Sequence, residues 1–207
     1  MSQKNWLDNH ELFYKELQTG LKFQSILAKR LKEEDIPIFF ESIGLELNPD
    51  DCSKEQYDEW LSTRKDVKAS RKKYGAQDKD ILIGESKMSC ECKSRDVSFS
   101  GVESFPYPDI FIDTVSGYEK KQVKPTYTFC ISQKSEAIIY TESSPDNTSK
   151  WLKKFIYDKK RGIKELNYSA PKALWKDFSQ FKTDFFNKYK WQNKSVIKNY
   201  GRIHWRY

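Results

Sequence analysis

The stretch 78–96 constrains the fold most strongly, because it reads as two short strands joined by a tight turn. The apolar run 81–83 is followed by Gly84-Glu85-Ser86, a sequence that suits such a turn. A second strand-like run then begins, in which successive side chains point to alternate faces. We therefore predict a β-hairpin in the middle of the chain.

The second run of this hairpin separates charged side chains from thiols. Glu91 and Lys93 share one face, whereas Cys90 and Cys92 share the other. If the two runs pair, Asp80 lies beside Glu91, and two carboxylates converge with one ammonium group. Close carboxylates repel one another unless a cation lies between them. Mg²⁺ suits this role because it prefers oxygen ligands and often takes only one or two carboxylates.

Asp80 and the tripeptide Glu91-Cys92-Lys93, separated by ten residues, resemble the metal-binding signature of the PD-(D/E)XK nuclease superfamily. Restriction endonucleases, Holliday junction resolvases and many phage and repair nucleases belong to it. The resemblance covers about residues 12–142, with Lys79 where the family name has proline. It implies an α/β, restriction-endonuclease-like core whose central mixed β-sheet is flanked by helices.

The resemblance also implies a chemistry. Asp80 and Glu91 would hold Mg²⁺, for which Mn²⁺ would substitute, and Lys93 would position or activate the attacking water. The expected function is a metal-dependent endonuclease that hydrolyses phosphodiester bonds of DNA. The alternatives are a nucleic-acid-binding module of the same fold without catalysis, a nuclease that cuts RNA, and a protein that binds another protein through its aromatic C-terminal stretch.

Two other segments match the same short pattern. They are Glu85-Ser86-Lys87 and Glu119-Lys120-Lys121, and Pro108-Asp109 precedes the second at a similar spacing. The first lies in the predicted turn and the second in a polar run, whereas Glu91 is flanked by residues that pack in a half-buried strand. This context favours Glu91, and the remaining alternative is a hairpin with a surface ion pair.

Three polar residues are candidate accessory groups. Residues 9–34 predict a long amphipathic helix, and Gln24 interrupts its apolar stripe. The family often directs a glutamate from its first core helix at the metal, so Gln24 resembles that residue, and Glu16 is a second candidate. Gln77 precedes Asp80 much as a glutamine does in some nucleases of this class. For Gln24, a glutamine at the edge of the stripe is the structural alternative.

The remaining core elements follow from apolar runs. We predict strands at 36–40, 126–132 and 137–141, and the last two are apolar enough to be central strands buried on both faces. Residues 109–113 are expected to be a strand or a short helix. The proline- and tyrosine-rich segment 105–108 is expected to border a substrate groove.

Charge is unevenly distributed along the chain, whose formal net charge is +7. Residues 150–207 hold 16 Lys or Arg and 4 Asp or Glu, a surplus of 12 positive charges. Such a basic, aromatic-rich segment predicts a polyanionic partner, with DNA preferred to RNA because of the family resemblance. The candidate nucleic-acid-binding residues are Lys72, Lys73, Arg95, Lys153, Lys154, Lys160 and Arg161.

The length of 207 residues suits a single domain. We expect a core over about 9–142 and a basic helical extension over about 148–207, with one helix from 148 or 149 and another from 171. The cysteines are expected to be buried thiols rather than zinc ligands. With no apolar run that spans a membrane and no signal segment, we expect an intracellular protein, in the cytoplasm of a bacterial cell or a phage-infected host. A homodimer would allow both DNA strands to be cut.

Overall fold

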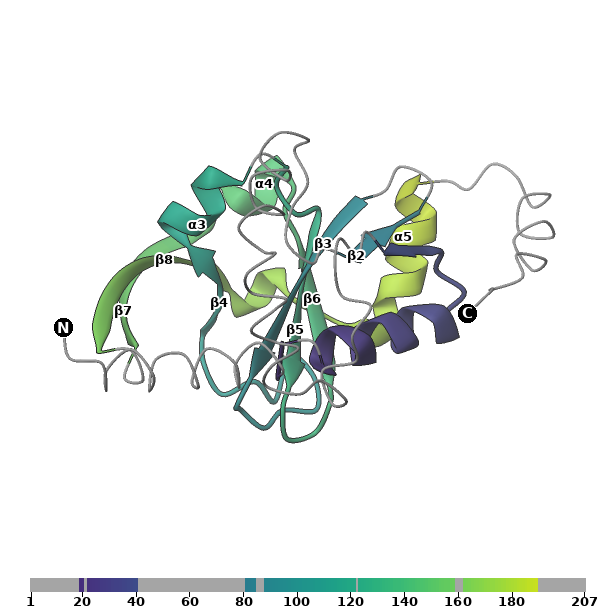
Figure 1. Cartoon of the computed structure of the whole chain (residues 1–207), viewed down its shortest axis with the longest axis horizontal. Coiled ribbons are helices and arrows are strands. Elements are labelled where there is room, and N and C mark those ends of the chain that lie inside the picture. The colour runs from purple at the N-terminus through teal and green to yellow at the C-terminus, as the bar shows by residue number, and fades with distance from the viewer. Residues whose placement is uncertain are drawn as a thin grey trace, which may run out of the picture.

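The computed structural model describes residues 19–40 except 21, and residues 81–84, 88–121, 123–158 and 162–189. Its main sheet has six strands in the order β1-β2-β3-β5-β6-β9 (Figure 1). The strands are β1 (Ile38–Phe40), β2 (Ile81–Ile83), β3 (Met88–Arg95), β5 (Tyr127–Ser132), β6 (Ile138–Glu142) and β9 (Lys176–Asp177). Only β3 and β5 run parallel among the paired strands, so the sheet is mixed. The predicted α/β fold with a mixed sheet is confirmed.

A second, three-stranded antiparallel sheet has the order β4-β8-β7. It consists of β4 (Asp109–Thr114), β7 (Leu152–Asp158) and β8 (Ile163–Pro171). The short helix α3 (Val115–Lys120) follows β4 directly, and α4 (Pro145–Thr148) follows β6. Of the two predictions for 109–113, the strand is therefore the right one.

Two hydrophobic clusters lie on opposite sides of the main sheet. On one side, the helical residues 22–33 and α5 (Phe181–Tyr189) pack with Phe129 and Tyr127, and Figure 1 shows both helices on this side. On the other side, side chains of β4 and α3 pack against Cys130 and Ile139. All six residues of β5 are buried, which confirms that it is a central strand. The two sides thus have different roles, one helical and one that carries the second sheet.

The predicted basic helix that begins at 148 or 149 is wrong. Ser144 caps α4, which ends at Thr148, and the chain then forms strand β7 paired with β8. The apolar residues at 151, 152, 155 and 156 satisfy a helical period, but they also fit a two-sided strand. Pairing with β8 decides between the two, and Gly162, with φ of 66°, supplies the left-handed residue in the connection.

The second predicted C-terminal helix begins later than expected. Pro171 ends β8 instead of opening a helix, and the 3₁₀ turn η2 (Lys172–Leu174), strand β9 and the turn η3 (Phe178–Gln180) follow. Only α5 is an α-helix in the described part of this region. Phe181 and Phe185 are fully buried in it, which explains why the helix begins where its apolar stripe can reach the sheet.

The remaining predictions on the fold agree with the structure in part. Residues 19–20 and 22–33 are helical, and Leu27 and Leu31 are fully buried, as the amphipathic pattern indicates. Within the described ranges, no helix is long and apolar enough to cross a membrane.

The described cysteines behave as buried thiols. Cys90 and Cys130 are buried, and Cys92 is half-buried. Burial raises the pKa of Cys92 to about 12 and that of Cys130 to about 11.

Candidate active site

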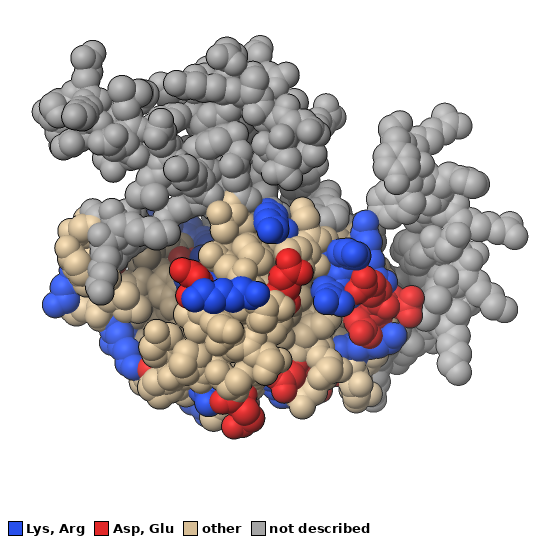
Figure 2. Space-filling view, turned by 90° about the horizontal axis from the view of Figure 1, so that it is seen from below, with Lys and Arg blue, Asp and Glu red and all other residues tan. Residues whose placement is uncertain are grey.

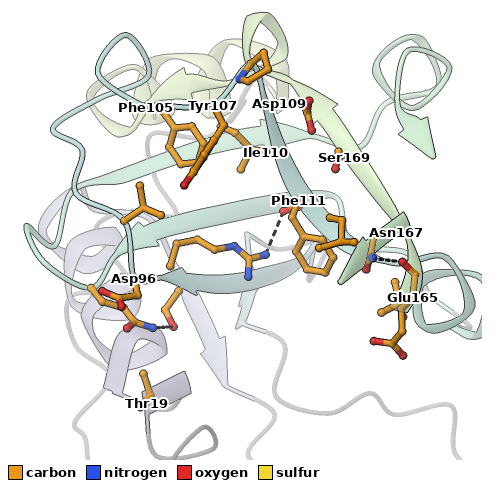
Figure 3. Close-up of a pocket in the computed structure, with 17 residues that line it drawn as sticks. Thr19, Asp96, Phe105, Tyr107, Asp109, Ile110, Phe111, Glu165, Asn167 and Ser169 are labelled. Carbon is orange, nitrogen blue, oxygen red and sulfur yellow. Dashed lines mark hydrogen bonds between the residues drawn. The ribbon is translucent and has the colours of Figure 1, made fainter. Parts of the chain in front are cut away.

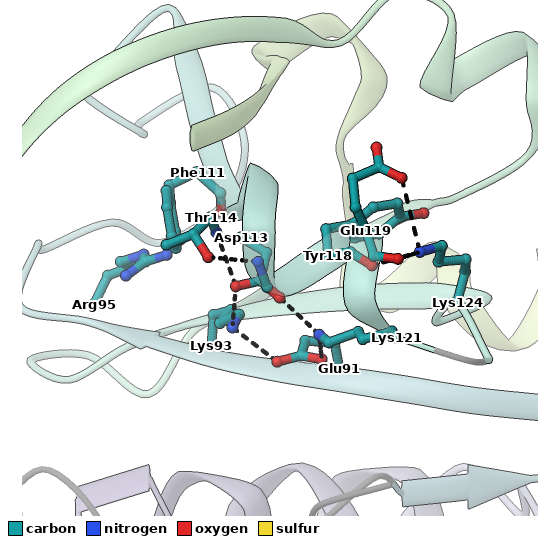
Figure 4. Close-up of polar contacts among 11 residues, drawn as sticks. Glu91, Lys93, Arg95, Phe111, Asp113, Thr114, Tyr118, Glu119, Lys121 and Lys124 are labelled. Carbon is teal, nitrogen blue, oxygen red and sulfur yellow. Dashed lines mark hydrogen bonds and ion pairs between the residues drawn. The ribbon is translucent and has the colours of Figure 1, made fainter. Parts of the chain in front are cut away.

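Strand β3 positions Glu91 and Lys93, the two predicted catalytic residues that the structure describes. Cys90 points into the main core, and the alternation of side chains directs Glu91 and Lys93 to the opposite face, toward β4 and α3 (Figure 4). The pairing of Ile81 with Cys90 confirms the predicted hairpin. Glu91 and Lys93 do share a face, and the Lys93 Nζ lies 2.8 Å from the Glu91 Oε1.

Two further residues, which are not among the predicted site residues, complete the group. Lys121 Nζ donates to Glu91 Oε2 at 2.5 Å and to Asp113 Oδ2 at 2.7 Å. Lys93 Nζ also lies 3.6 Å from Asp113 Oδ1. Two carboxylates and two ammonium groups therefore alternate in a closed ring, with a formal charge of zero (Figure 4). We call Glu91, Lys93, Asp113 and Lys121 the charged tetrad.

Local structure at the end of β4 brings Asp113 and Lys121 together. The β4–β8 register shifts between Phe111 and Asp113, and the next residue, Thr114, caps α3 by accepting a hydrogen bond from Gly117 N at 3.0 Å. A Cβ on Gly117 would lie 2.6 Å from Thr114 Oγ1, so this close approach requires glycine. Because α3 is short, its C-terminal neighbour Lys121 stays within reach of Asp113.

The tetrad is shielded from water, which strengthens its electrostatic interactions. Its four side chains are between 14% and 21% exposed. Burial by itself raises the pKa of Glu91, but the ammonium groups of Lys93 and Lys121 outweigh it and the pKa is lowered. The same balance lowers the pKa of Asp113. Burial opposes the charge on Lys121, yet Glu91 and Asp113 raise its pKa overall. All three groups are therefore charged at neutral pH.

Several predicted site residues lie outside the described part of the chain. They are Asp80, Glu16, Gln77, Lys72, Lys73, Lys160 and Arg161. Gln24 is described, but its helix packs on the Cys90 face of β3. Figure 4 shows this helix on the far side of β3 from the tetrad. The structure therefore does not bring Gln24 to Glu91, because its helix covers the apolar face of the sheet.

The described basic candidates all have partners within the protein. The Arg95 guanidinium lies 4.4 Å from the centre of the Phe111 ring and donates to the Phe111 carbonyl oxygen at 3.4 Å. Burial lowers its pKa. Lys154 pairs with Asp109, and Lys153 lies 5.3 Å from the centre of the Tyr168 ring. Figure 2 shows acidic and basic side chains side by side on one face of the molecule.

A cleft of about 870 Å³ lies beside the tetrad, between the second sheet and the loops that follow β3. Arg95, Phe111 and Thr114 line it, and Thr114 directly follows Asp113. Figure 3 shows Phe111 and Asn167 on the wall that the second sheet forms. The segment 105–108 contributes Phe105, Tyr107 and Pro108 to the wall, as the prediction of a groove-bordering loop requires. None of the four tetrad residues lines the cleft, which comes nearest to them in sequence at Thr114.

Sequence reasoning missed Asp113 and Lys121 for different reasons. Asp113 ends the predicted strand at 109–113, so its place on a strand could be predicted from the sequence. The sequence did not indicate that Lys93 and Lys121 would be its partners. Lys121 belongs to the Glu119-Lys120-Lys121 segment, which reads as solvated. Glu119 is indeed exposed, with a side-chain exposure of 58%, whereas Lys121 turns inward. Lys121 was considered only as part of this competing motif, and its ion pairs with Glu91 and Asp113 were therefore not predicted.

Comparison of the chain with protein-family models, with curated proteins and with solved structures finds no match. The function must therefore be inferred from the tetrad and the surfaces around it.

Among the described residues, no group of three or more His, Cys, Asp or Glu is arranged to hold a metal ion. Glu91 and Asp113 nevertheless share a single ammonium group, Lys121, within hydrogen-bonding distance of both. A position between these carboxylates thus accommodates a cation, and their oxygens are the ligand type that Mg²⁺ prefers. The donor set fits such an ion, provided that Lys121 moves away.

Proposed function

We propose that this chain is a metal-dependent endonuclease that hydrolyses phosphodiester bonds of DNA, of the PD-(D/E)XK type. The observation that carries the proposal is the contact between Glu91 and Lys93, 2.8 Å apart on one strand of a mixed sheet. A carboxylate that is ionised because of neighbouring ammonium groups is a suitable metal ligand, and a lysine beside it is a suitable donor to a phosphate oxygen.

Asp80 and Glu91 are the proposed Mg²⁺ ligands, and Asp113 is a further candidate. Ile81, which follows Asp80 in the chain, pairs with Cys90, which precedes Glu91. When bound, Mg²⁺ supplies a Lewis acid that stabilises negative charge on the phosphate and favours ionisation of water. Mn²⁺ has the same preference for oxygen ligands and is expected to substitute.

Lys93 is the proposed catalytic lysine. Its ammonium group lies between Glu91 and Asp113, so both carboxylates hold it in place. From there it can donate a hydrogen bond to the attacking water or to a non-bridging phosphate oxygen, where negative charge develops. Lys121, once displaced from the carboxylates, can offset phosphate charge in the same way.

A cleavage assay tests the proposal. Supercoiled plasmid is incubated with Mg²⁺ and with the wild-type protein, Glu91→Gln or Lys93→Ala. We expect cleavage by the wild type and a loss of about 10²- to 10⁴-fold in each variant, the range typical of a removed acid–base group. Glu119→Gln tests the competing segment and is expected to retain full activity. Equal cleavage by Lys93→Ala and the wild type would contradict the proposal.

The same assay examines the other properties implied by the resemblance. Labelled RNA in place of plasmid separates a DNA nuclease from an RNA nuclease. Linear products from a single encounter would support a homodimer, since cutting both strands uses two active sites. We propose that the enzyme acts in the cytoplasm of a bacterial cell or of a phage-infected host, where its DNA substrate is found.

A second candidate function is a nucleic-acid-binding module without catalysis. The observation that favours it is the zero formal charge of the tetrad, in which each carboxylate already has two ammonium partners. Such a ring can hold β3, β4 and α3 together without any chemistry. DNA binding without cleavage, in the wild type and in Lys93→Ala alike, would identify this function.

A further inference from the structure

The hairpin formed by β7 and β8 exposes large side chains that other strands of this protein bury. Phe155 is 65% exposed and Tyr157 is 59% exposed, although both lie within a regular strand. Strand β7 is at the edge of its sheet, so these rings lie at a margin of the structure. Exposed rings gathered on one element are typical of an interaction surface.

Register places rings and lysines on the same face of the hairpin. Lys153, Phe155 and Tyr157 alternate with residues of the other face, and they pair with Tyr168, Leu166 and Lys164 of β8. Lys164 Nζ lies 5.3 Å from the centre of the Phe155 ring, and Lys153 Nζ lies 5.3 Å from the centre of the Tyr168 ring. Ammonium groups and aromatic faces therefore interleave, and we call this the outer face of the hairpin.

Charge identifies the partner. Of the six paired residues on the outer face, Lys153 and Lys164 are basic and none is acidic. Surfaces that bind proteins are depleted in lysine at their centre, whereas surfaces that bind single-stranded nucleic acid combine basic groups with rings on which bases stack. The composition of the outer face matches the second description.

The outer face is also connected to the candidate active site. The Tyr168 ring packs 5.5 Å from the Tyr118 ring of α3, measured between centres, and its hydroxyl donates to Glu119 Oε1 at 2.6 Å. Lys121 of the tetrad directly follows α3. A ligand bound along the hairpin would therefore lie next to α3, which is directly followed by the tetrad residue Lys121.

We propose that the outer face of the β7–β8 hairpin binds an unpaired strand of nucleic acid. Bases stack on Phe155 and Tyr157, and Lys153 and Lys164 pair with phosphates. This inference rests on the proposed function in so far as it assigns a substrate class to the same protein, namely DNA that contains a single-stranded segment.

Fluorescence anisotropy tests it, with a labelled oligo-dT and a matched duplex as probes, in EDTA so that no cleavage occurs. Phe155→Ala/Tyr157→Ala should weaken oligo-dT binding by about tenfold for each ring that stacks a base, while Tyr157→Phe, which keeps the ring, should bind as the wild type does. Lys153→Ala/Lys164→Ala should reduce the slope of log K against log salt by about 1.4. All four side chains are partly or largely exposed, and thermal melts verify folding.

The outcomes separate this inference from the proposed function. Plasmid cleavage by the wild type together with unchanged oligo-dT binding by both double variants would overturn the inference and leave the nuclease standing. Ring-dependent binding of oligo-dT without cleavage would support the inference and overturn the nuclease. A wild-type protein that ignores oligo-dT, or whose hairpin instead mediates self-association abolished by Phe155→Ala/Tyr157→Ala, would overturn the inference.

Discussion

The charged tetrad and the outer face of the β7–β8 hairpin use lysine in opposite ways. In the tetrad, Lys93 and Lys121 meet carboxylates, and the side chains are at most 21% exposed. On the hairpin, Lys153 and Lys164 meet the rings of Tyr168 and Phe155, next to side chains that are up to 65% exposed. The first group balances its charge internally, whereas the second leaves positive charge for a partner.

This difference has an energetic meaning. Removing one member of a shielded ion-pair ring leaves an uncompensated charge, which lowers the free energy of unfolding strongly. Removing an exposed lysine changes the free energy of unfolding only slightly. The tetrad should therefore dominate stability and chemistry, and the hairpin should dominate binding. The predictions below test this division.

The largest effect is expected from Asp113→Ala. This change leaves two ammonium groups with a single carboxylate in a shielded site, and it should lower the free energy of unfolding by about 3–5 kcal/mol. Urea denaturation measures it. Asp96→Ala is the matched control, because Asp96 and Lys134 form an exposed pair 3.6 Å apart, for which about 0–1 kcal/mol is expected. Equal losses of unfolding free energy in the two variants would show that the shielded ion pairs of the tetrad stabilise the protein no more than an exposed pair does.

The second-largest effect is expected in the pH dependence of the free energy of unfolding. Glu91 and Asp113 have pKa values below their ordinary values of 4.5 and 3.8. Their contribution is therefore present above those ordinary values and is lost as the pH falls through the lower folded values. Lys121 has a pKa above its ordinary 10.5, so its contribution is present below that value and is lost as the pH rises further.

Denaturation midpoints measured between pH 7 and pH 2 check the acidic part of this profile. Asp113→Asn should lose less stability on acidification than the wild type, because one of the titrating carboxylates is gone. Lys164→Ala on the hairpin should keep the wild-type profile. A wild-type profile in Asp113→Asn would show that the tetrad does not contribute to acid sensitivity.

The next effect in size is expected from Lys121→Met and concerns the affinity for Mg²⁺. Its ammonium group donates to Glu91 and Asp113, so a cation that binds between these carboxylates competes with it. Removing the ammonium group should tighten Mg²⁺ binding by about tenfold, measured by calorimetry. Lys124→Met provides a control, since Lys124 donates to the carbonyl oxygens of Tyr118 and Glu119 and not to the tetrad. Unchanged Mg²⁺ affinity in Lys121→Met would show that Lys121 does not compete with the ion for Glu91 and Asp113.

The smallest effect is expected from Lys164→Ala on stability. Its ammonium group lies 5.3 Å from the centre of the Phe155 ring, and that ring is exposed. The change in the free energy of unfolding should stay within about 0.5 kcal/mol, as measured by thermal or urea denaturation. A larger loss would mean that the outer face stabilises the hairpin instead of serving a partner.

The central hairpin was predictable from sequence because its signals are local. Alternation along 88–95 separates Glu91 from Cys90, and a glycine turn precedes it, so pairing follows from residues close together in the chain. The apolar strands β5 and β6 were predictable for the same reason. A short run of apolar residues specifies burial without knowledge of distant partners.

The C-terminal half was less predictable because its signals are ambiguous. Residues 151–156 fit a helix as well as a strand, and the pairing of β7 with β8 settles the matter through tertiary contacts. Lys121 and Asp113 were missed because their meeting depends on a register shift in β4 and on the length of α3. Neither feature has a distinct signature in a chain with 37 Lys or Arg residues.

A crystal structure of the protein grown or soaked with Mn²⁺ tests the central claim most directly, because anomalous scattering locates the ion. The account predicts a Mn²⁺ peak coordinated by Glu91, with the Lys121 ammonium group moved away from that carboxylate and Lys93 still beside it. A map in which Lys121 still bridges Glu91 and Asp113, with no ion on Glu91, would contradict it.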